Sequence, residues 1–381
     1  MKNRIRSIQI LRGTAALLVV IAHIFEHPAA EVAQWELVTG RFGVDIFFVI
    51  SGFIIMSITP DGPFRPYGFV VRRILRVVPL YWLCTLLVFV IALAAPSVFK
   101  RTVADPAHLL ASLAFVPVPT PLDPTDWRPM LKLGWTLQYE MFFYLVVALL
   151  YWCRSRLLRA RIVTTLFGGL VLVSFFVEPQ ASRLAFYANS SLMSFVVGVW
   201  LAVAAEAGAF GTAGAGRSRA LAVTAVAAIA TTTLLYALPM ADDVGVVDHV
   251  PLTLAAGLVV ATGLFAEPWS RDDRLEFPLA VGDWSYSLYL THMFVVGAAW
   301  AVAGRLHVAS PVGLVLVGVG ALATSIAVAA LSYRLVEVPA NALGRRLDDG
   351  GRRRGRDVRS SAGGDGPSSP PPTPATPSAA E

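Results

Sequence analysis

The first long apolar stretch of this 381-residue chain carries two polar residues that a membrane helix would normally avoid. Residues 8–25 read IQILRGTAALLVVIAHIF, which is long enough to cross a bilayer, with Arg12 near the start and His23 near the end. Eleven helical residues span roughly 16 Å, so Arg12 is expected near one membrane face and His23 beyond the midplane. Ionisable groups inside a membrane span are costly and mark functional paths. The segment therefore predicts chemistry within a membrane.

Composition supports a protein with many membrane spans. Hydrophobic residues make up 56% of the chain and charged residues 15%, whereas soluble domains have about a quarter charged residues. Cys84 and Cys153 both fall inside predicted spans, so they form neither a disulfide framework nor a metal-ligand cluster, and no metal is expected. The net charge of +6 lies in short loops and in the tail, which argues against nucleic-acid binding.

The apolar segments predict an all-α integral membrane protein, a bundle of about ten transmembrane helices within residues 1–340. From residue 344 to 381 the composition changes to Arg, Gly, Ser and Pro, which predicts a disordered cytoplasmic tail whose arginines contact anionic lipids. The ten spans are expected near residues 8–26, 42–58, 75–95, 135–153, 162–177, 186–205, 220–238, 248–266, 284–304 and 312–333.

The basic residues predict the orientation. An even number of spans puts both termini on one side, and cytoplasmic loops carry the excess of Lys and Arg. With the N-terminus in the cytoplasm, 24 of the 31 Lys and Arg residues lie in inner segments and 7 in outer ones. We therefore expect both termini in the cytoplasm. The proline-rich loop over 96–134 is then the long external connection, and the sequence leaves open whether it covers an outward-facing site or forms a loose lid.

Three arginines open the third span in the run RRILRVVPLYW. Arg73 and Arg76 are three residues apart and share a helix face, and Arg72 lies one turn from Arg76. These residues are either topology signals only or a phosphate-binding site, since arginine pairs with phosphate oxygens in a fork geometry.

On the opposite side the orientation places His23, Asp45 and Glu140 in the outer half of the membrane. A carboxylate that fixes the tautomer of a histidine gives the arrangement of a general base. A structural hydrogen bond or a proton relay would use the same residue types. The ninth span adds a polar stripe with Ser285, Tyr289 and His292, which serves either helix packing or stabilisation of an oxyanion.

These segments resemble the membrane acyltransferase-3 family, whose members acylate sugars and other acceptors with acyl-coenzyme A as donor. The matching motifs occur in the family's order between residues 9 and 339. The sequences of the first two motifs are most similar to exopolysaccharide acetyltransferases. The motifs are LRGTAALLVVIAH, FFVISGFII, RRILRVVPLYW, GWTLQYEMFFY, SYSLYLTH and SYRLVEVP.

The resemblance assigns roles to individual residues. It implies that His23 and Arg12 are the essential His and Arg of the first span, and that Arg73 and Arg76 form the Arg-x-x-Arg pair, with Arg72 adjacent. It implies that Glu140 is the Glu of the fourth span. Two positions depart from the family: Gln9 stands where an acidic residue is frequent, and Glu337-Val338-Pro339 replaces Glu-Arg-Pro or Glu-Lys-Pro.

The expected function is a multi-pass O-acyltransferase of the bacterial inner membrane. It would move an acyl group, acetyl or alternatively succinyl, from cytoplasmic acyl-coenzyme A to a hydroxyl of an extracytoplasmic carbohydrate such as exopolysaccharide or its lipid-linked precursor. Membrane lipids and proteins of polysaccharide assembly are the expected partners. The alternatives are a proton-coupled transporter that uses His23 and the carboxylates as a relay, and an acyltransferase that acts on a small molecule such as a macrolide.

Overall fold

The computed structural model describes residues 5–26, 35–59, 61–62, 64, 66–99, 101–178, 182–210, 226, 250–267 and 273–348. These residues form helices joined by loops, and none of the described residues belongs to a β-strand. Every predicted span except 220–238 overlaps helix, and 220–238 lies outside the described residues apart from Val226. The all-α prediction is therefore confirmed for the described part of the chain.

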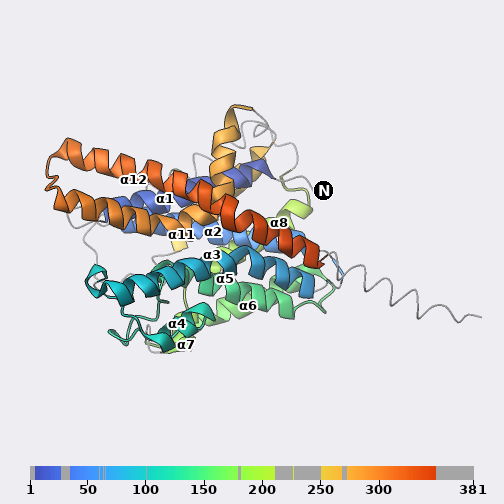
Figure 1. The fold of residues 1–381 in the computed structure, drawn as a ribbon. Coiled ribbons are helices and arrows are strands. Elements are labelled where there is room, and N and C mark those ends of the chain that lie inside the picture. Colours follow the sequence, from blue (N-terminus) through green and yellow to red (C-terminus); the bar gives the residue numbers. More distant parts are fainter. Residues whose placement is uncertain are drawn as a thin grey trace, which may run out of the picture.

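The helices are arranged as a bundle (Figure 1). The last of them continues beyond Ser332 through a π-helical turn, Tyr333–Glu337, and reaches Asp348. The helices are α1 (Arg6–Phe25), α2 (Trp35–Ile58), α3 (Pro66–Ala94), α4 (Pro106–Leu113), α5 (Trp135–Leu149), α6 (Arg156–Val173), α7 (Arg183–Tyr187), α8 (Leu192–Glu206), α10 (Val250–Phe265), α11 (Glu276–Arg305) and α12 (Pro311–Ser332).

Within the described ranges, five helices are both long and apolar enough to cross a membrane. Two further apolar helices, α8 and α10, are shorter. A chain with several such helices is a membrane protein. The five long spans are Arg6–Phe25, Thr39–Ile58, Pro66–Ala94, Glu276–Arg305 and Pro311–Asp348.

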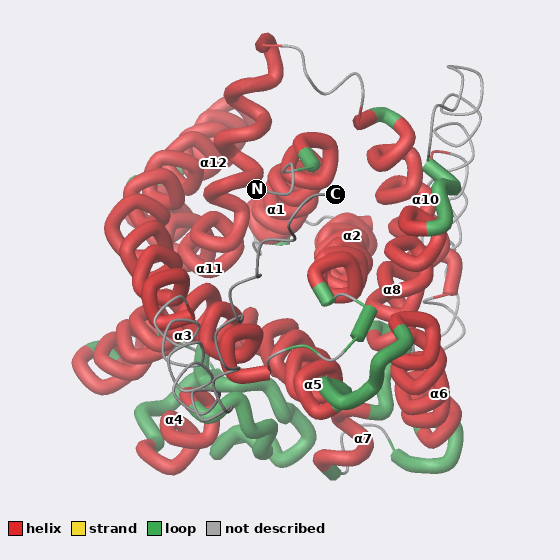
Figure 2. Tube along the Cα trace, turned by 90° about the vertical axis from the view of Figure 1, so that its right-hand side faces the viewer, coloured by secondary structure: helices red, strands yellow, loops and turns green. Residues whose placement is uncertain are grey.

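Close backbone packing fixes α1 against α11. A Cβ added to Gly13 would lie 2.9 Å from the backbone nitrogen of Gly282, and one added to Gly282 would lie 2.0 Å from the carbonyl oxygen of Gln9. Small residues let helix backbones approach in membrane bundles, so no larger residue fits at this crossing. Figure 2 shows α1 and α2 in the middle of the bundle with α11, α3, α5, α8 and α10 around them. The crossing sets the position of the polar residues of α1 relative to α11.

The span predicted over 186–205 is wrong as a single helix. The structure ends α7 at Tyr187 and begins α8 at Leu192. Between them the side-chain oxygen of Asn189 accepts a hydrogen bond from the backbone N–H of Ser191 at 2.9 Å. A short polar side chain that binds a nearby backbone group competes with helix formation, which explains the break.

The loop over 96–134, which we call the cap, is folded against α3. Its helix α4 is capped by Asp105, whose carboxylate accepts a hydrogen bond from the backbone N–H of His108 at 2.6 Å. The hydroxyl of Tyr81 in α3 donates to the carbonyl oxygen of Ser112 at 3.0 Å. The Ser112 hydroxyl in turn accepts from the backbone N–H of Met130 at 2.9 Å. These contacts join the two halves of the cap to the middle of α3.

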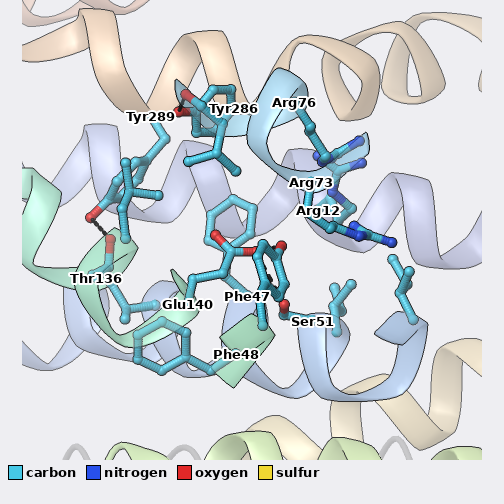
Figure 3. Close-up of a pocket in the computed structure, with 16 residues that line it drawn as sticks. Arg12, Phe47, Phe48, Ser51, Arg73, Arg76, Thr136, Glu140, Tyr286 and Tyr289 are labelled. Carbon is cyan, nitrogen blue, oxygen red and sulfur yellow. Dashed lines mark hydrogen bonds between the residues drawn. The ribbon is translucent and has the colours of Figure 1, made fainter. Parts of the chain in front are cut away.

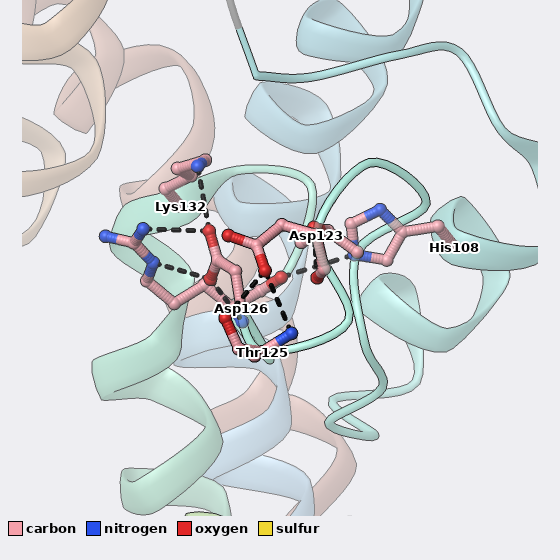
Figure 4. Close-up of polar contacts among 7 residues, drawn as sticks. His108, Asp123, Thr125, Asp126 and Lys132 are labelled. Carbon is pink, nitrogen blue, oxygen red and sulfur yellow. Dashed lines mark hydrogen bonds and ion pairs between the residues drawn. The ribbon is translucent and has the colours of Figure 1, made fainter. Parts of the chain in front are cut away.

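A charged cluster holds the second half of the cap (Figure 4). The Asp126 carboxylate accepts two hydrogen bonds from Arg128, both at 2.8 Å, and one from Lys132 at 2.9 Å. Burial acts to raise the pKa of Asp126, but the hydrogen bonds from Arg128 and Lys132 outweigh it and hold the pKa below its ordinary value of 3.8. Burial also lowers the pKa of His108 from 6.5, and its Nε2 lies 3.2 Å from the carbonyl oxygen of Arg128.

Candidate active site

A pocket of about 170 Å³ lies between α1, α2, α3, α5 and α11 (Figure 3). One side carries the guanidinium groups of Arg12, Arg73 and Arg76, and the opposite side carries the hydrogen-bonded pair Thr136 and Tyr289. The arginines come from two helices, Arg12 from α1 and the other two from α3. The remaining lining residues are Val44, Phe47, Phe48, Ile50, Ser51, Ile54, Val77, Leu137, Glu140, Tyr144 and Tyr286.

The arginines predicted to bind phosphate divide into two groups. Arg73 lies over the ring of Tyr144, with 5.4 Å from its Cζ to the ring centroid, and Arg76 lines the same pocket. Arg72 instead forms an ion pair with Asp348, at the end of the helix that continues from α12. The structure therefore brings Arg73 and Arg76 together with Arg12 at the pocket and turns Arg72 toward Asp348.

Glu140 lines the pocket that holds the arginines, and among the described contacts it does not touch His23. Its carboxylate accepts a hydrogen bond from the Ser51 hydroxyl at 3.1 Å and another from the Tyr144 hydroxyl. Their expected depths separated Glu140 from the inner arginines, but the structure places Glu140, in the second turn of α5, in the lining of the pocket that Arg12 also lines. The carboxylate is placed to balance the positive charge there.

Asp45 points to another part of the bundle. It accepts a hydrogen bond from the Ser194 hydroxyl of α8 at 2.7 Å, and Ser194 also contacts Thr253 of α10 at 3.1 Å. Among the described contacts, neither Asp45 nor Glu140 touches the imidazole of His23. The expectation that one of these carboxylates orients the imidazole has no counterpart in this arrangement.

A backbone carbonyl orients His23 instead. Its Nδ1 lies 2.8 Å from the carbonyl oxygen of Val19, and because a carbonyl only accepts, Nδ1 must carry the proton. The neutral ring then has its lone pair on Nε2, the atom a general base uses. That Nε2 lies 3.8 Å from a carboxylate oxygen of Glu26, and the side chain of His23 is 21% exposed.

The polar stripe of α11 is buried, as predicted, but its members differ in what they can do. His292 faces His23, with ring centroids 5.0 Å apart, and its Nδ1 is committed to the carbonyl oxygen of Leu288 at 3.1 Å. Ser285 is fully buried and does not line the pocket. Tyr289 does line it, and its ring centroid lies 6.2 Å from that of His292. Tyr289 thus connects the pocket to the histidine pair.

Two residues of this arrangement were missed in the sequence. Glu26 is three residues after His23, a spacing that places both on one helix face, and this was the available signal. Thr136 lies in the segment GWTLQYE, in which only the glutamate was predicted to belong to the site. The Thr136 hydroxyl lies 2.9 Å from the Tyr289 hydroxyl. In the part of the chain that the structure describes, no group of three or more His, Cys, Asp or Glu residues could hold a metal ion.

Comparison with known proteins places the chain among acyltransferases. The family profile described as an acyltransferase domain matches residues 5–333. The exopolysaccharide production protein ExoZ of Rhizobium meliloti is 34% identical over 88% of this chain and 96% of its own length. The acyltransferase MdmB of Streptomyces mycarofaciens is 25% identical over 90% of this chain and 93% of its own length.

The O-acetyltransferase OatA of Staphylococcus aureus is 28% identical over 50% of this chain and 33% of its own length. No solved structure matches the chain. The matched family favours acyl transfer over the transporter alternative. Because the profile covers residues 5–333 and the rhizobial relative is matched over nearly its whole length, this chain belongs to the acyltransferase-3 family and is a membrane O-acyltransferase.

Proposed function

We propose that the protein transfers an acetyl group from cytoplasmic acetyl-coenzyme A to a hydroxyl of an extracytoplasmic carbohydrate, either an exopolysaccharide or its lipid-linked precursor. The similarity to a protein named for exopolysaccharide production supports the acceptor class. The distribution of basic residues supports a ten-span arrangement in the bacterial inner membrane with both termini in the cytoplasm.

The pocket of Figure 3 is the observation that carries this proposal. Arg12, Arg73 and Arg76 hold phosphate oxygens of the donor, because guanidinium groups pair with phosphate through two parallel hydrogen bonds. Glu140 lines the same pocket and offsets part of the positive charge of the arginines. Arg72 joins the donor site only when it leaves Asp348. The pantetheine arm then runs from the arginines toward Tyr289.

His23 is the general base. Its Nδ1–H is held by Val19, so its Nε2 lone pair is available to the acceptor hydroxyl. A base that shares its depth with the end of the donor pocket can act on an acceptor arriving from the opposite membrane face. Family resemblance assigns the essential histidine to the same residue.

Tyr289 is the donor to the oxyanion, and Thr136 makes this role feasible. Both hydroxyls lie near the carbonyl oxygen of Leu133, at 3.0 Å from Tyr289 and 3.1 Å from Thr136. The Thr136 proton alone satisfies that carbonyl, so the Tyr289 proton is free to turn to a developing negative charge. His292 has no such proton when neutral, because its Nδ1–H is bound to Leu288.

The reaction balances with these groups. The acceptor oxygen attacks the thioester carbonyl carbon while His23 Nε2 takes the hydroxyl proton, and the carbonyl oxygen becomes an oxyanion bound by Tyr289. Collapse of the tetrahedral intermediate breaks the carbon–sulfur bond. The imidazolium returns the proton to the thiolate, which gives the acetyl ester and free coenzyme A.

The test is transfer of label in a defined system. Purified protein in lipid nanodiscs receives acetyl-coenzyme A labelled in the acetyl group, together with exopolysaccharide from the host that mild alkali has deacetylated. We expect label in the polysaccharide and one equivalent of free thiol per ester. A protein that consumes no thioester under these conditions, with acetyl- or succinyl-coenzyme A, contradicts the proposal.

A further inference from the structure

The cap carries a guanidinium group that is held in a fixed position. Arg128 binds both oxygens of Asp126 through Nε and Nη2, a fork geometry that leaves Nη1 outside the pair. The backbone around it is also held, since the backbone N–H of Thr120 donates to the carbonyl oxygen of Asp126 at 2.7 Å. The Arg128 side chain is nevertheless 45% exposed. An arginine that is fixed in place and still accessible is preorganised for a ligand.

Glu26 lies next to the base and carries the charge opposite to that of this arginine. It follows the last residue of α1, its side chain is 58% exposed, and its Oε2 lies 3.8 Å from Nε2 of His23. Glu26 also attracts Arg128 electrostatically. The unprotonated Nε2 of His23 therefore faces a second hydrogen-bond acceptor, the Glu26 carboxylate. Arg128, whose charge interacts with Glu26, supplies a hydrogen-bond donor.

The position of Glu26 argues against a role in orienting the imidazole. An orienting carboxylate binds the nitrogen opposite the reacting one, and here the Val19 carbonyl already holds Nδ1. Glu26 lies on the Nε2 side, where the acceptor must approach. Nε2 and Oε2 lie 3.8 Å apart and both accept, so two neighbouring hydroxyl groups of one sugar ring can donate to them, one to each.

We propose that Glu26 and Arg128 form the acceptor subsite and bind hydroxyl groups of a sugar ring next to His23. A ring hydroxyl next to the reacting one donates to the Glu26 carboxylate, and a hydroxyl of the same sugar accepts from the Arg128 guanidinium. The proton of the reacting hydroxyl goes to Nε2 of His23, and Glu26 takes no part in that transfer. This subsite rests on the proposed function, since it names the residues that receive the carbohydrate.

The experiment separates binding of the sugar from the chemical step. An oligosaccharide prepared from deacetylated exopolysaccharide serves as acceptor for the wild type, Glu26→Gln and Arg128→Gln. We expect the KM for the oligosaccharide to rise roughly 10-fold to 100-fold in each variant, the range for one charged hydrogen bond. The kcat and the KM for acetyl-coenzyme A should change less than about twofold.

A matched control is Arg305→Gln, which removes another exposed arginine at the α11 end without touching the cap. It should leave both KM values unchanged. Arg128→Lys keeps the charge and loses the fork to Asp126, so it reports whether loss of the cap structure explains the Arg128 result. If Arg128→Gln fails to fold, Glu26→Gln still decides the question, because Glu26 is exposed.

Three results would overturn the subsite. One is a fall in kcat for Glu26→Gln with an unchanged oligosaccharide KM, which makes Glu26 a positioning residue for His23. The second is normal kinetics in both variants. The third is equal binding of the oligosaccharide, without donor, to the wild type and Glu26→Gln. That last measurement needs no transfer, so it distinguishes failure of the subsite from failure of the proposed acetyl transfer.

Discussion

His23 and His292 face each other across α1 and α11, with ring centroids 5.0 Å apart and ring planes at 66°. Each imidazole donates a hydrogen bond from Nδ1–H to the carbonyl oxygen four residues earlier in its own helix. The acceptor is Val19 for His23 and Leu288 for His292. The two rings are therefore in the same tautomer, with unprotonated Nε2 atoms. His23 is partly accessible and His292 is completely buried, so only His23 can meet an acceptor.

The first prediction concerns this base. His23→Ala should lower kcat by about 10² to 10⁴-fold, the usual contribution of a general base, while the affinity for coenzyme A stays within about twofold. The two effects separate because the arginines proposed to hold the donor line the pocket, whereas His23 does not. Rates and coenzyme A binding measured on the same nanodisc preparation check this. Transfer at a near-normal rate by His23→Ala would leave His23 with a structural role only.

The second prediction concerns the oxyanion. Tyr289→Phe should lower kcat by about 10² to 10³-fold, as removal of one oxyanion donor does elsewhere. Thr136→Val should also slow transfer, because Tyr289 must then satisfy the Leu133 carbonyl alone, whereas Thr136→Ser should retain most activity. The matched control is Tyr81→Phe, which removes a buried hydroxyl that donates to a backbone carbonyl outside the pocket. Equal activity of the two Phe variants would exclude Tyr289 from the chemical step.

Hydropathy alone predicted where helices lie, because backbone groups inside a membrane must be satisfied within the segment and helices do so. It failed where a local side chain competes with the helix, as at Asn189 between α7 and α8. It also started α3 at residue 75 instead of Pro66, since the arginines of its first turns are polar although the segment is helical. Apolar content marks the part of a helix that meets lipid rather than its full length.

The site was predicted in its residue types and only partly in its geometry. Arg12, Arg73 and Arg76 meet in one pocket because α1 and α3 both begin at the same end of the bundle, which the charge pattern had indicated. The partner of His23 was not predictable from depth, because residues expected at one depth turn to different neighbours: Glu140 lines the arginine pocket and Asp45 binds Ser194. Arg159, counted as an orientation signal, is fully buried and donates to the carbonyl oxygens of Cys153 and Thr59.

The third prediction separates donor arginines from structural ones. Arg73→Gln and Arg76→Gln should each weaken coenzyme A binding by about 1.5–3 kcal/mol for every charged hydrogen bond lost. Arg72→Gln should weaken it less, because Arg72 is paired with Asp348. Isothermal titration with coenzyme A and with dephospho-coenzyme A checks which phosphate each arginine meets. Unchanged affinity in the Arg73 and Arg76 variants would show that these arginines serve topology alone.

The fourth prediction concerns orientation. A cysteine placed at Pro124, at the exposed turn of the cap, should react with a membrane-impermeant maleimide on intact cells. One placed at Arg345, near the end of the helix that continues from α12, should react only after permeabilisation. The native Cys84 and Cys153 are buried and free, so they add little background. The reverse labelling pattern would place the arginines outside and contradict a cytoplasmic donor.

The last prediction concerns the cap in mild acid. Burial lowers the pKa of His108 below 6.5, so the folded protein keeps this residue neutral where the unfolded chain begins to bind a proton. The contribution of neutral His108 to the free energy of unfolding is therefore complete above pH 6.5, and it is lost progressively as the pH falls toward the lowered pKa. Asp126, whose pKa lies below 3.8, keeps its charge through the same pH range, so it does not make the stability of the protein depend on pH there.

Thermal unfolding in detergent at pH 7.5 and pH 5.5 measures this contribution. In His108→Gln the new side chain keeps an N–H that can reach the carbonyl oxygen of Arg128, but it does not titrate. The unfolding temperature of this variant should therefore fall less between pH 7.5 and pH 5.5 than that of the wild type. His307→Gln, at an exposed position between α11 and α12, serves as the control and should keep the wild-type pH dependence. If the His108 variant loses as much stability in acid as the wild type, the cap does not exclude the charged imidazole, and burial of His108 has no energetic consequence in this range.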